Sequence, residues 1–322
     1  MKKWMMVISL AFALVFTLSA CGNNDEAGEK HTIGVTQFVE HPSLDAAYDG
    51  FKKAIEESGL NVEFDYQNAQ ADINNTATIA NNLVSKGVDL IFANATPSAQ
   101  GAYNATKEIP IVFASVSDPF EAGFVEALDQ ADKTITGVID LHPEFTEKTI
   151  AFIEDNVPNA KVGMVYNSGE ANSNSQKESV EEAMKGTTLE LVTRSISTSA
   201  DVQQAAQSLV GEVDVILVTT DNIVVNALEA VIQVANDNKI PLIVGEPDSL
   251  ARGGFATYGV DFYEIGFRAG EMAVSILKGE ETVGSIAIEA PPEMPLYINK
   301  TAAELQGVTW KAEWDDTAEI IE

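Results

Sequence analysis

The sequence carries one strand-and-helix pattern twice, and this duplication restricts the possible folds more than any other feature. In each copy, short β-branched runs alternate with amphipathic stretches, a rhythm that predicts parallel sheets covered by helices on both faces. The copies are about 125 to 131 residues apart, and two copies are too few for a short-period solenoid. We therefore expect two similar α/β lobes. The matching pairs are 31–43 with 161–173, 72–96 with 201–221, and 108–119 with 239–249.

We expect Rossmann-like lobes joined by a hinge of three chain crossings, which together form a clamshell. A long helical pattern from Val260 to Gly279 has no counterpart in the first copy. It is expected to return to lobe one, before a third crossing near 285–290 sends the tail back. Lobe one is thus predicted to comprise residues 31–139 and 262–284, and lobe two residues 140–261 and 290–322. In the first copy we expect strands at 32–37, 61–66, 88–93 and 110–115, and helices at 43–58, 72–86 and 97–107.

The predicted topology also places a ligand. In open parallel sheets, ligands bind outside the carboxyl ends of the strands, and two facing sheets bring all these ends around one cleft. The loops at the predicted strand ends are mostly small and polar, which favours a binding site there. They are 36–45, 95–98 and 115–118 in lobe one, and 167–172, 219–222 and 246–249 in lobe two.

Several of these loops resemble helix starts. Thr96 precedes Pro97 and can cap a helix whose first N–H groups, around Thr96 to Ser98, would suit a ligand carboxylate. Asn167 and Asp221 head similar starts, and the alternative is that all three residues only cap their own helices. The loops also hold acids that can pair with a ligand ammonium: Asp118, Glu170, Asp221, Glu246 and Asp248. Three aromatic residues are candidates either for a ligand wall or for the core: Phe38, Phe113 and Tyr263.

Residue types that the loops lack narrow the ligand class. None of the three arginines (Arg194, Arg252 and Arg268) lies in a cleft loop, which disfavours a polyanionic ligand. The absence of tryptophan from these loops disfavours a sugar. The three histidines are scattered, and no nucleophile, phosphate-binding or dinucleotide motif stands at a strand-to-helix turn. We therefore predict no metal site, no cofactor and no enzymatic activity.

The charge of the chain excludes one class of partner. Lysines and arginines number 19 against 49 aspartates and glutamates, for a formal charge of −30. A nucleic-acid-binding protein needs a basic face, so we predict no nucleic-acid partner.

The N-terminal residues predict a secreted, lipid-anchored protein. Lys2 and Lys3 precede an uncharged apolar run over 4–17, which is typical of a signal peptide. Leu18-Ser19-Ala20-Cys21 follows, and Cys21 is the only cysteine. This tetrad resembles the lipobox of bacterial lipoproteins, so residues 1–21 are predicted to be the signal peptide and lipobox, with Cys21 acylated. Residues 22–30 are polar and are expected to form a flexible tether.

Seven stretches, in order across nearly the whole chain beyond the signal peptide, resemble the substrate-binding lipoproteins of ABC importers, in the family with tryptophan- and tyrosine-binding members. The resemblance implies a type-I periplasmic-binding fold, an extracytoplasmic location, and permease and ATPase partners. It also implies an aromatic amino acid as ligand: tryptophan, tyrosine or phenylalanine. The stretches are TQFVEHPSLDAAYDGF (36–51), ANATPSAQ (93–100), FASVSDPFEAG (113–123), YNSGEANS (166–173), DVQQAAQSL (201–209), TTDN (219–222) and GVDFYEIG (259–266).

The resemblance also assigns cleft positions, to which the predicted helix start adds Ser98. The implied positions are Thr36, Gln37, Leu44, Thr96, Ser115, Asp118, Asn167, Glu170, Asn172, Thr219, Asp221 and Asp248. Three alternatives stay open: a binding lipoprotein that feeds a signalling partner, an extracellular enzyme on a similar fold, and a binder of another solute such as a branched amino acid or a sugar. We expect a monomer.

Overall fold

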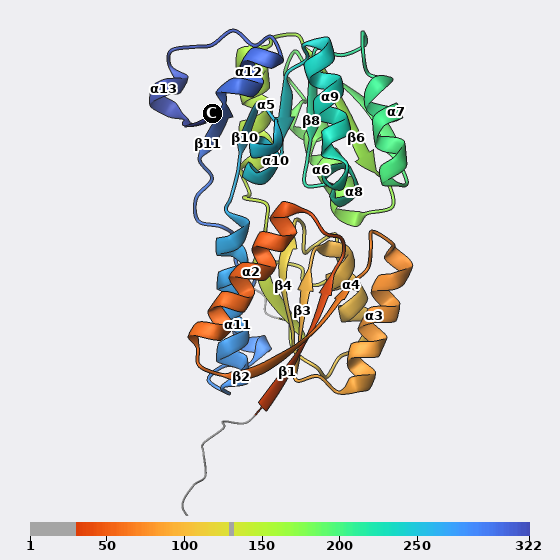
Figure 1. Ribbon diagram of the computed structural model, residues 1–322, viewed down its shortest axis with the longest axis vertical. Helices are drawn as coiled ribbons and strands as arrows, with labels where there is room; N and C mark the ends of the chain where they lie inside the picture. The colour runs from red at the N-terminus through yellow and green to blue at the C-terminus, as the bar shows by residue number, and fades with distance from the viewer. Residues whose placement is uncertain (1–29, 129–131) are drawn as a thin grey trace, which may run out of the picture.

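The computed structural model describes residues 30–128 and 132–322 as two α/β lobes stacked along the long axis (Figure 1). The predicted signal peptide, Cys21 and nearly all of the predicted tether lie outside the described residues.

The first lobe is built on a parallel five-stranded sheet with the order β2-β1-β3-β4-β5. Helices α3 and α4 lie together on one face, and α2 and α11 on the other (Figure 1). The strands are β1 (Lys30–Gln37), β2 (Asn61–Asn68), β3 (Leu90–Asn94), β4 (Ile111–Val116) and β5 (Ile135–Ile139). The helices are α2 (Pro42–Glu57), α3 (Ile73–Lys86), α4 (Thr96–Ala105) and α11 (Phe262–Leu277).

The second lobe is built on a seven-stranded sheet with the order β12-β11-β10-β9-β8-β6-β7, parallel except that β11 runs antiparallel to β10. Its strands are β6 (Lys161–Asn167), β7 (Glu190–Ile196), β8 (Val215–Val218), β9 (Leu242–Val244), β10 (Ala256–Tyr258), β11 (Leu296–Asn299) and β12 (Glu319–Ile321). Its helices are α5 (Phe145–Asn156), α6 (Ala171–Ala183), α7 (Val202–Gln207), α8 (Asn222–Asn226), α9 (Leu228–Asn238), α10 (Pro247–Arg252), α12 (Lys300–Leu305) and α13 (Trp314–Thr317). Two 3-10 turns, η1 (Ser199–Asp201) and η2 (Val283–Ser285), complete the elements.

Central strands of both sheets are continuous runs of buried residues. Every residue of β3, β4 and β8 is buried. Strands covered by helices on both faces require such runs, whereas a strand with one wet face would alternate apolar and polar residues. This burial leaves the strand ends as the places where polar side chains of the two sheets can meet.

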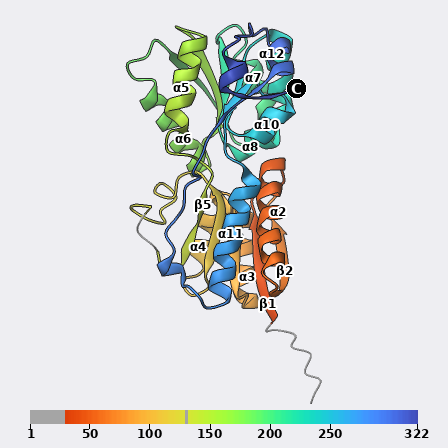
Figure 2. The ribbon, with the colours of Figure 1, turned by 90° about the vertical axis from the view of Figure 1, so that its left-hand side faces the viewer.

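The chain crosses between the lobes three times: from β5 to α5, from β10 to α11, and from η2 to β11 (Figure 2). A parallel bridge between Val138 and Glu289 holds the third crossing against β5. The predicted fold class, two Rossmann-like lobes joined by a three-crossing hinge, is confirmed. No helix within the described residues is long and apolar enough to cross a membrane.

Candidate ligand-binding site between the lobes

The two lobes touch across the carboxyl ends of their strands. Direct side-chain hydrogen bonds join loops of lobe one to helix starts of lobe two, so the cleft is shut. They are Ser43 to Glu246 at 2.7 Å, Ser117 to Thr220 at 3.0 Å, Ser175 to Asp118 at 2.5 Å, and Gln176 to Ser117 at 3.4 Å.

Buried polar atoms without hydrogen-bond partners gather at these strand ends. Within the described residues they come from both lobes and from neighbouring strands, although almost all buried polar groups in folded proteins are paired. Each unpaired group costs about 1–3 kcal/mol. A ligand that filled these valences would offset that cost. The atoms are Asn94 Oδ1, Thr96 Oγ1, Ser115 Oγ and Asp140 Oδ1 in lobe one, and Asn172 Oδ1 and Thr219 Oγ1 in lobe two.

Two residues at the ends of lobe-one strands, close to these unpaired atoms, have unusual backbone conformations. Ala95, directly after β3, has φ +84°, and Ser115, near the end of β4, has φ +59°. Non-glycine residues avoid positive φ, and such strain tends to occur at functional sites. Because β3 and β4 are neighbours in the sheet, the two strained residues lie at one edge, next to Thr96.

The helix starts differ from the sequence prediction in two of three loops. Thr96 does not cap α4, because Ala95 is the capping position, the helix begins at Thr96 itself, and the Thr96 hydroxyl has no partner in the described structure. Asn167 does not cap α6, since its Oδ1 accepts from Gly169 N at 2.9 Å before the helix starts. Asp221 does cap α8, accepting from Ile223 N and Val224 N.

Glu170 and Asp221 form a buried acidic pair in lobe two, and their oxygens are already occupied. Glu170 accepts from Asn167 Nδ2 at 3.1 Å and Asn222 Nδ2 at 2.5 Å. Asp221 accepts from Asn167 N at 2.5 Å as well as from the α8 backbone. Burial, followed by the charge of Asp221, raises the pKa of Glu170, and burial also raises the pKa of Asp221. Each oxygen of the pair thus already accepts at least one hydrogen bond from its own lobe.

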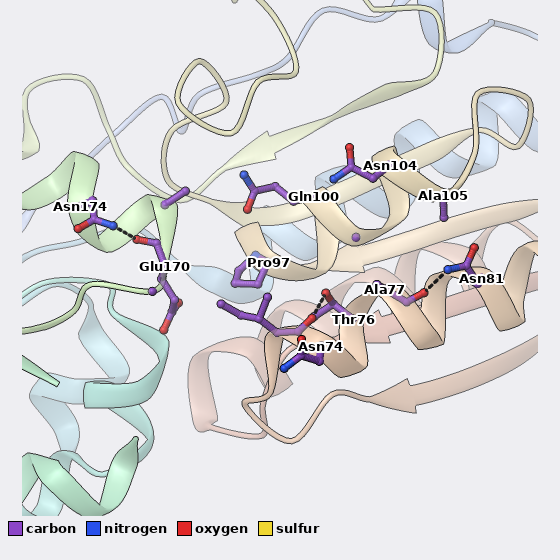
Figure 3. A pocket seen from close by; sticks show the side chains of 14 residues that line it. Asn74, Thr76, Ala77, Asn81, Pro97, Gln100, Asn104, Ala105, Glu170 and Asn174 are labelled. Carbon is purple, nitrogen blue, oxygen red and sulfur yellow. Dashed lines mark hydrogen bonds between the residues drawn. The ribbon is translucent and has the colours of Figure 1, made fainter. Parts of the chain in front are cut away.

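Glu170 also faces a wide opening between the lobes. A cavity of about 690 Å³ lies between α3 and α4 on one side and the start of α6 on the other. Figure 3 shows Glu170 on the lobe-two wall and Pro97 on the lobe-one wall, with Gln100 and Asn74 farther along it.

The other predicted site residues of lobe one lie at the same edge of the sheet and contact one another. The Thr36 hydroxyl lies 3.4 Å from that of Ser98, and both side chains are buried. Asn94 Nδ2 donates to Gln37 Oε1 at 3.2 Å and to the Leu44 carbonyl at 2.7 Å. These contacts tie the end of β1 and the start of α2 to β3.

Asp118 and Asp248 lie at the margin of the closed cleft. Asp118 caps the turn that follows it and accepts from Ser175 of the other lobe. Asp248 is half-buried on α10, where burial and the charge of Asp261 raise its pKa.

The three aromatic residues offered as a ligand wall do not share a surface. Phe113 has no exposed surface and packs against Phe124 with ring centroids 5.9 Å apart, so it belongs to the lobe-one core. Tyr263 lies on α11 and stacks on Phe267. Phe38 is fully buried at the end of β1. The structure thus places Phe38 and Phe113 in one buried cluster and Tyr263 on a different element.

Sequence reasoning missed several polar residues at the cleft. Asp140 follows β5, a strand that was not among those predicted, so the strand-end rule did not reach it. A hydrogen bond from its N–H to the Val116 carbonyl holds it to lobe one, although lobe two was predicted to begin at residue 140. Ser117 and Thr220 lie in predicted cleft loops but were not named as site residues, and they bond each other across the cleft. Gln176, which donates to Ser117, lies inside α6, where only the orientation of the helix reveals it.

Comparison with known proteins identifies the family of this chain. Residues 32–319 match the family described as ABC transporter substrate binding protein. The chain belongs to this family. The family resemblance predicted from sequence is thus confirmed, as is the role of substrate-binding component of an ABC transporter. Members of this family work outside the cytoplasm.

Individual relatives cover almost the whole substrate-binding chain. A protein named tyrosine-binding protein from Clostridioides difficile is 40% identical over 315 residues, 93% of this chain and 90% of the relative. The solved structure of an ABC domain in complex with L-Trp from Streptococcus pneumonia is 30% identical and has a TM-score of 0.85, covering 91% of this chain and all of that one. A glucose-galactose binding protein from Geobacillus stearothermophilus, 17% identical with a TM-score of 0.63 over 84% of this chain and 97% of its own, shares the fold alone.

Comparison with a third solved relative shows which lobe arrangement this chain adopts. The ligand-free, open structure of a substrate-binding protein from Clostridium difficile is 36% identical over 91% of this chain and 99% of its own, yet its TM-score is only 0.65. The complex with L-Trp is less similar in sequence but superposes better. This substrate-binding protein is therefore in a closed arrangement, in agreement with its interlobe hydrogen bonds.

Proposed function

We propose that this substrate-binding protein captures a zwitterionic aromatic amino acid (tryptophan, tyrosine or phenylalanine) between its lobes and delivers it to an ABC permease. One observation carries the proposal: unpaired buried polar atoms converge from both lobes on the carboxyl ends of the strands. The tyrosine-binding relative and the relative solved with L-Trp support the choice of ligand class.

The ligand carboxylate is assigned to lobe one. The hydroxyls of Thr96 and Ser115 are unpaired, and α4 begins at Thr96. Hydroxyl donors and the N–H groups of a helix start suit a small anion without an arginine. Asn172 and Thr219 offer unpaired oxygens from the facing lobe, so the ligand would bind both lobes and hold them together. Thr36, Gln37, Leu44, Ser98, Asn167, Glu170 and Asp221 support these positions, with Asp118 and Asp248 at the margin.

We further propose that the protein is anchored by a lipid on Cys21 at the outer face of the cytoplasmic membrane. The apolar run, the tetrad that ends in Cys21 and the family's extracytoplasmic role support this location. In this role the protein acts as a monomer, partners a permease and an ATPase, and releases its ligand unchanged.

Ligand identity can be tested with protein purified without refolding. Native mass spectrometry should detect a bound aromatic amino acid, because tight ligands co-purify. After the ligand is removed, tryptophan, tyrosine or phenylalanine should raise the melting temperature, since a ligand at a hundredfold excess over Kd stabilises the folded state by about 2.7 kcal/mol. A clear shift with a pentose or nucleoside, and none with an aromatic amino acid, would reject this ligand class and leave the clamshell intact.

A further inference from the structure

We propose that Asp140 of lobe one, together with Glu246 of lobe two, forms the subsite that receives the ammonium group of the ligand. The inference rests on the proposed function and specifies where the cationic end of the amino acid sits. It assigns the hinge end of the cleft, rather than the Glu170–Asp221 pair, to this group.

Asp140 has the free valence that an ammonium needs. It follows β5 directly, at the first crossing of the hinge, and is 6% exposed. Its Oδ1 has no hydrogen-bond partner within the described residues. By contrast, each oxygen of Glu170 and Asp221 already accepts a hydrogen bond. The same is true of Glu246, which therefore contributes its charge to the subsite and not a free acceptor.

Glu246 faces Asp140 from the other lobe and is held firmly. It caps α10 through the Ser249 backbone N–H and accepts from the Ser43 hydroxyl across the cleft at 2.7 Å. The Ser249 hydroxyl also donates to it. Glu246 is 2% exposed, and its charge acts on Asp140. Two buried carboxylates from different lobes therefore meet only when the cleft shuts.

The space between them suits one small group. A cavity of about 10 Å³ is lined by Asp140 and Glu246 together with His41, Ser43, Thr220 and Asn222 among others. This is about the room that one water molecule needs, and an ammonium group is of similar size.

No lysine or arginine is among the described residues that line this cavity. His41 of α2 is neutral, because burial lowers its pKa to about 3. The guanidinium of Arg252 is paired with Glu229 at 2.8 Å and also donates to the Val225 carbonyl. Asp248, the remaining nearby group, adds another acid. Burying unpaired carboxylates is costly, so a cation from the ligand would stabilise the closed form.

Calorimetry with L-tyrosine and with 3-(4-hydroxyphenyl)propionate, which lacks the amino group, tests the proposal. In the wild type, loss of the amino group should weaken binding by about ten- to a hundredfold, the range for a hydrogen bond to a charged group. Asp140→Asn should weaken tyrosine binding similarly but leave binding of the amine-free analogue nearly unchanged. The matched control is Asp237→Asn, an exposed aspartate on α9, which should behave like the wild type.

The outcomes separate the inference from the proposed function. If the wild type binds no aromatic amino acid, the proposed ligand class fails. If it binds tyrosine and Asp140→Asn retains the full penalty for losing the amino group, the subsite assignment is overturned. Equal affinity of the wild type for tyrosine and its analogue would overturn it even if the variant did not fold. A requirement for sodium, with no penalty for losing the amino group, would assign the cavity to a metal cation and also reject the proposal.

Discussion

At the residue scale, the edge of lobe one concentrates both strain and unpaired polar atoms. Ala95 has φ +84° and ψ 153°, a region suited to glycine, and Ser115 has φ +59°. Such conformations cost about 1–3 kcal/mol each. Both lie beside hydroxyls without partners. A ligand that formed hydrogen bonds with these hydroxyls would offset the free-energy cost of the strain. This supports the assignment of the carboxylate end of the ligand to this edge.

Replacing Ala95 with glycine should relieve this strain. We expect Ala95→Gly to raise the free energy of unfolding by about 1 kcal/mol, because the relief exceeds the added chain entropy of glycine. Ala99→Gly, in the interior of α4, should instead lower it by about 1 kcal/mol or more. Urea denaturation of the ligand-free proteins measures both. A loss of stability in Ala95→Gly as large as in Ala99→Gly would show that Ala95 is not strained.

Cys21 should determine where the protein resides. The proposed lipid is attached through its thiol, and multiple acyl chains on one residue anchor stably where one chain would not. Cys21→Ala should release the protein into the medium or leave an uncleaved precursor, as seen by fractionation and mass spectrometry. Ser19→Ala, which keeps a small residue at its position, is the control and should stay anchored. A Cys21→Ala protein that is cleaved and still membrane-bound would contradict lipid anchoring.

Positions at strand ends could be predicted from sequence, but the bonding of their atoms could not. The rule for parallel sheets was enough to select Thr96, Ser115 and Thr219. It could not show that Glu170 would be saturated by Asn167 and Asn222, because those contacts depend on side chains brought together only by folding. For the same reason, the free oxygen of Asp140 has no signature in the sequence.

At the element scale, the contact between α2 and α11 attaches the returning segment to lobe one. The helices approach so closely that a Cβ on Gly266 would lie 1.8 Å from the Ala47 carbonyl oxygen. Gly50 of α2 faces α11 in the same way, with a Cβ 2.0 Å from the Tyr263 carbonyl oxygen. Glycines in facing positions thus let two backbones pack where side chains would separate them.

Gly266→Ala should therefore destabilise lobe one. Overpacking a tight interior contact typically costs about 1–3 kcal/mol, and this clash is with backbone that cannot rotate away. Gly284→Ala is the matched control, since a Cβ there would meet nothing closer than 3.8 Å. Differential scanning calorimetry should show a lower melting temperature for Gly266→Ala alone. Equal melting temperatures would mean that the helices can separate at little cost.

Long periodic elements were predictable, whereas short ones in the tail were not. The strands β1 to β4 and the helices of lobe one lie within a few residues of their predicted bounds, because each has a buried run or an amphipathic face. β5, with five residues, was not predicted. β11 and β12 have four and three residues, too few for a periodicity to appear. They are strands because they extend an existing sheet edge next to β10.

At the scale of the whole molecule, the closed arrangement brings Asp140 and Glu246 from different lobes to one buried cavity. Asp140, Glu246, Glu170 and Asp221 are all buried at the lobe interface, and burial is the largest cause of the raised pKa of each. Closing the empty cleft therefore costs free energy, because it buries carboxylates without a cationic partner. A cationic ligand group removes part of this cost, which makes closure depend on the ligand.

This coupling predicts that closure without ligand depends on pH. Closing transfers Asp140 into the protein and raises its pKa to about 7. In the open form Asp140 has the ordinary pKa of an aspartate and loses its proton at lower pH. The empty closed form therefore still holds this proton at pH values where the open form has released it. This contribution to closing is fully present below the ordinary pKa of an aspartate, about 4, and is lost as pH rises from there to about 7. Glu246, which accepts from Ser43 of the other lobe, shifts in the same direction, while His41, whose pKa is lowered, opposes closing at low pH.

Small-angle scattering can measure this dependence. The ligand-free protein should have a smaller radius of gyration at pH 5.5 than at pH 8, and saturating ligand should give the small radius at both values. In Asp140→Asn the pH dependence should be weaker, because one titrating group is lost, and the empty protein should be more compact at pH 8 than the wild type. Asp237→Asn should match the wild type. If the ligand-free radius is the same at both pH values while ligand still reduces it, the buried acids do not control closure, and the lobes are held apart by the hinge alone.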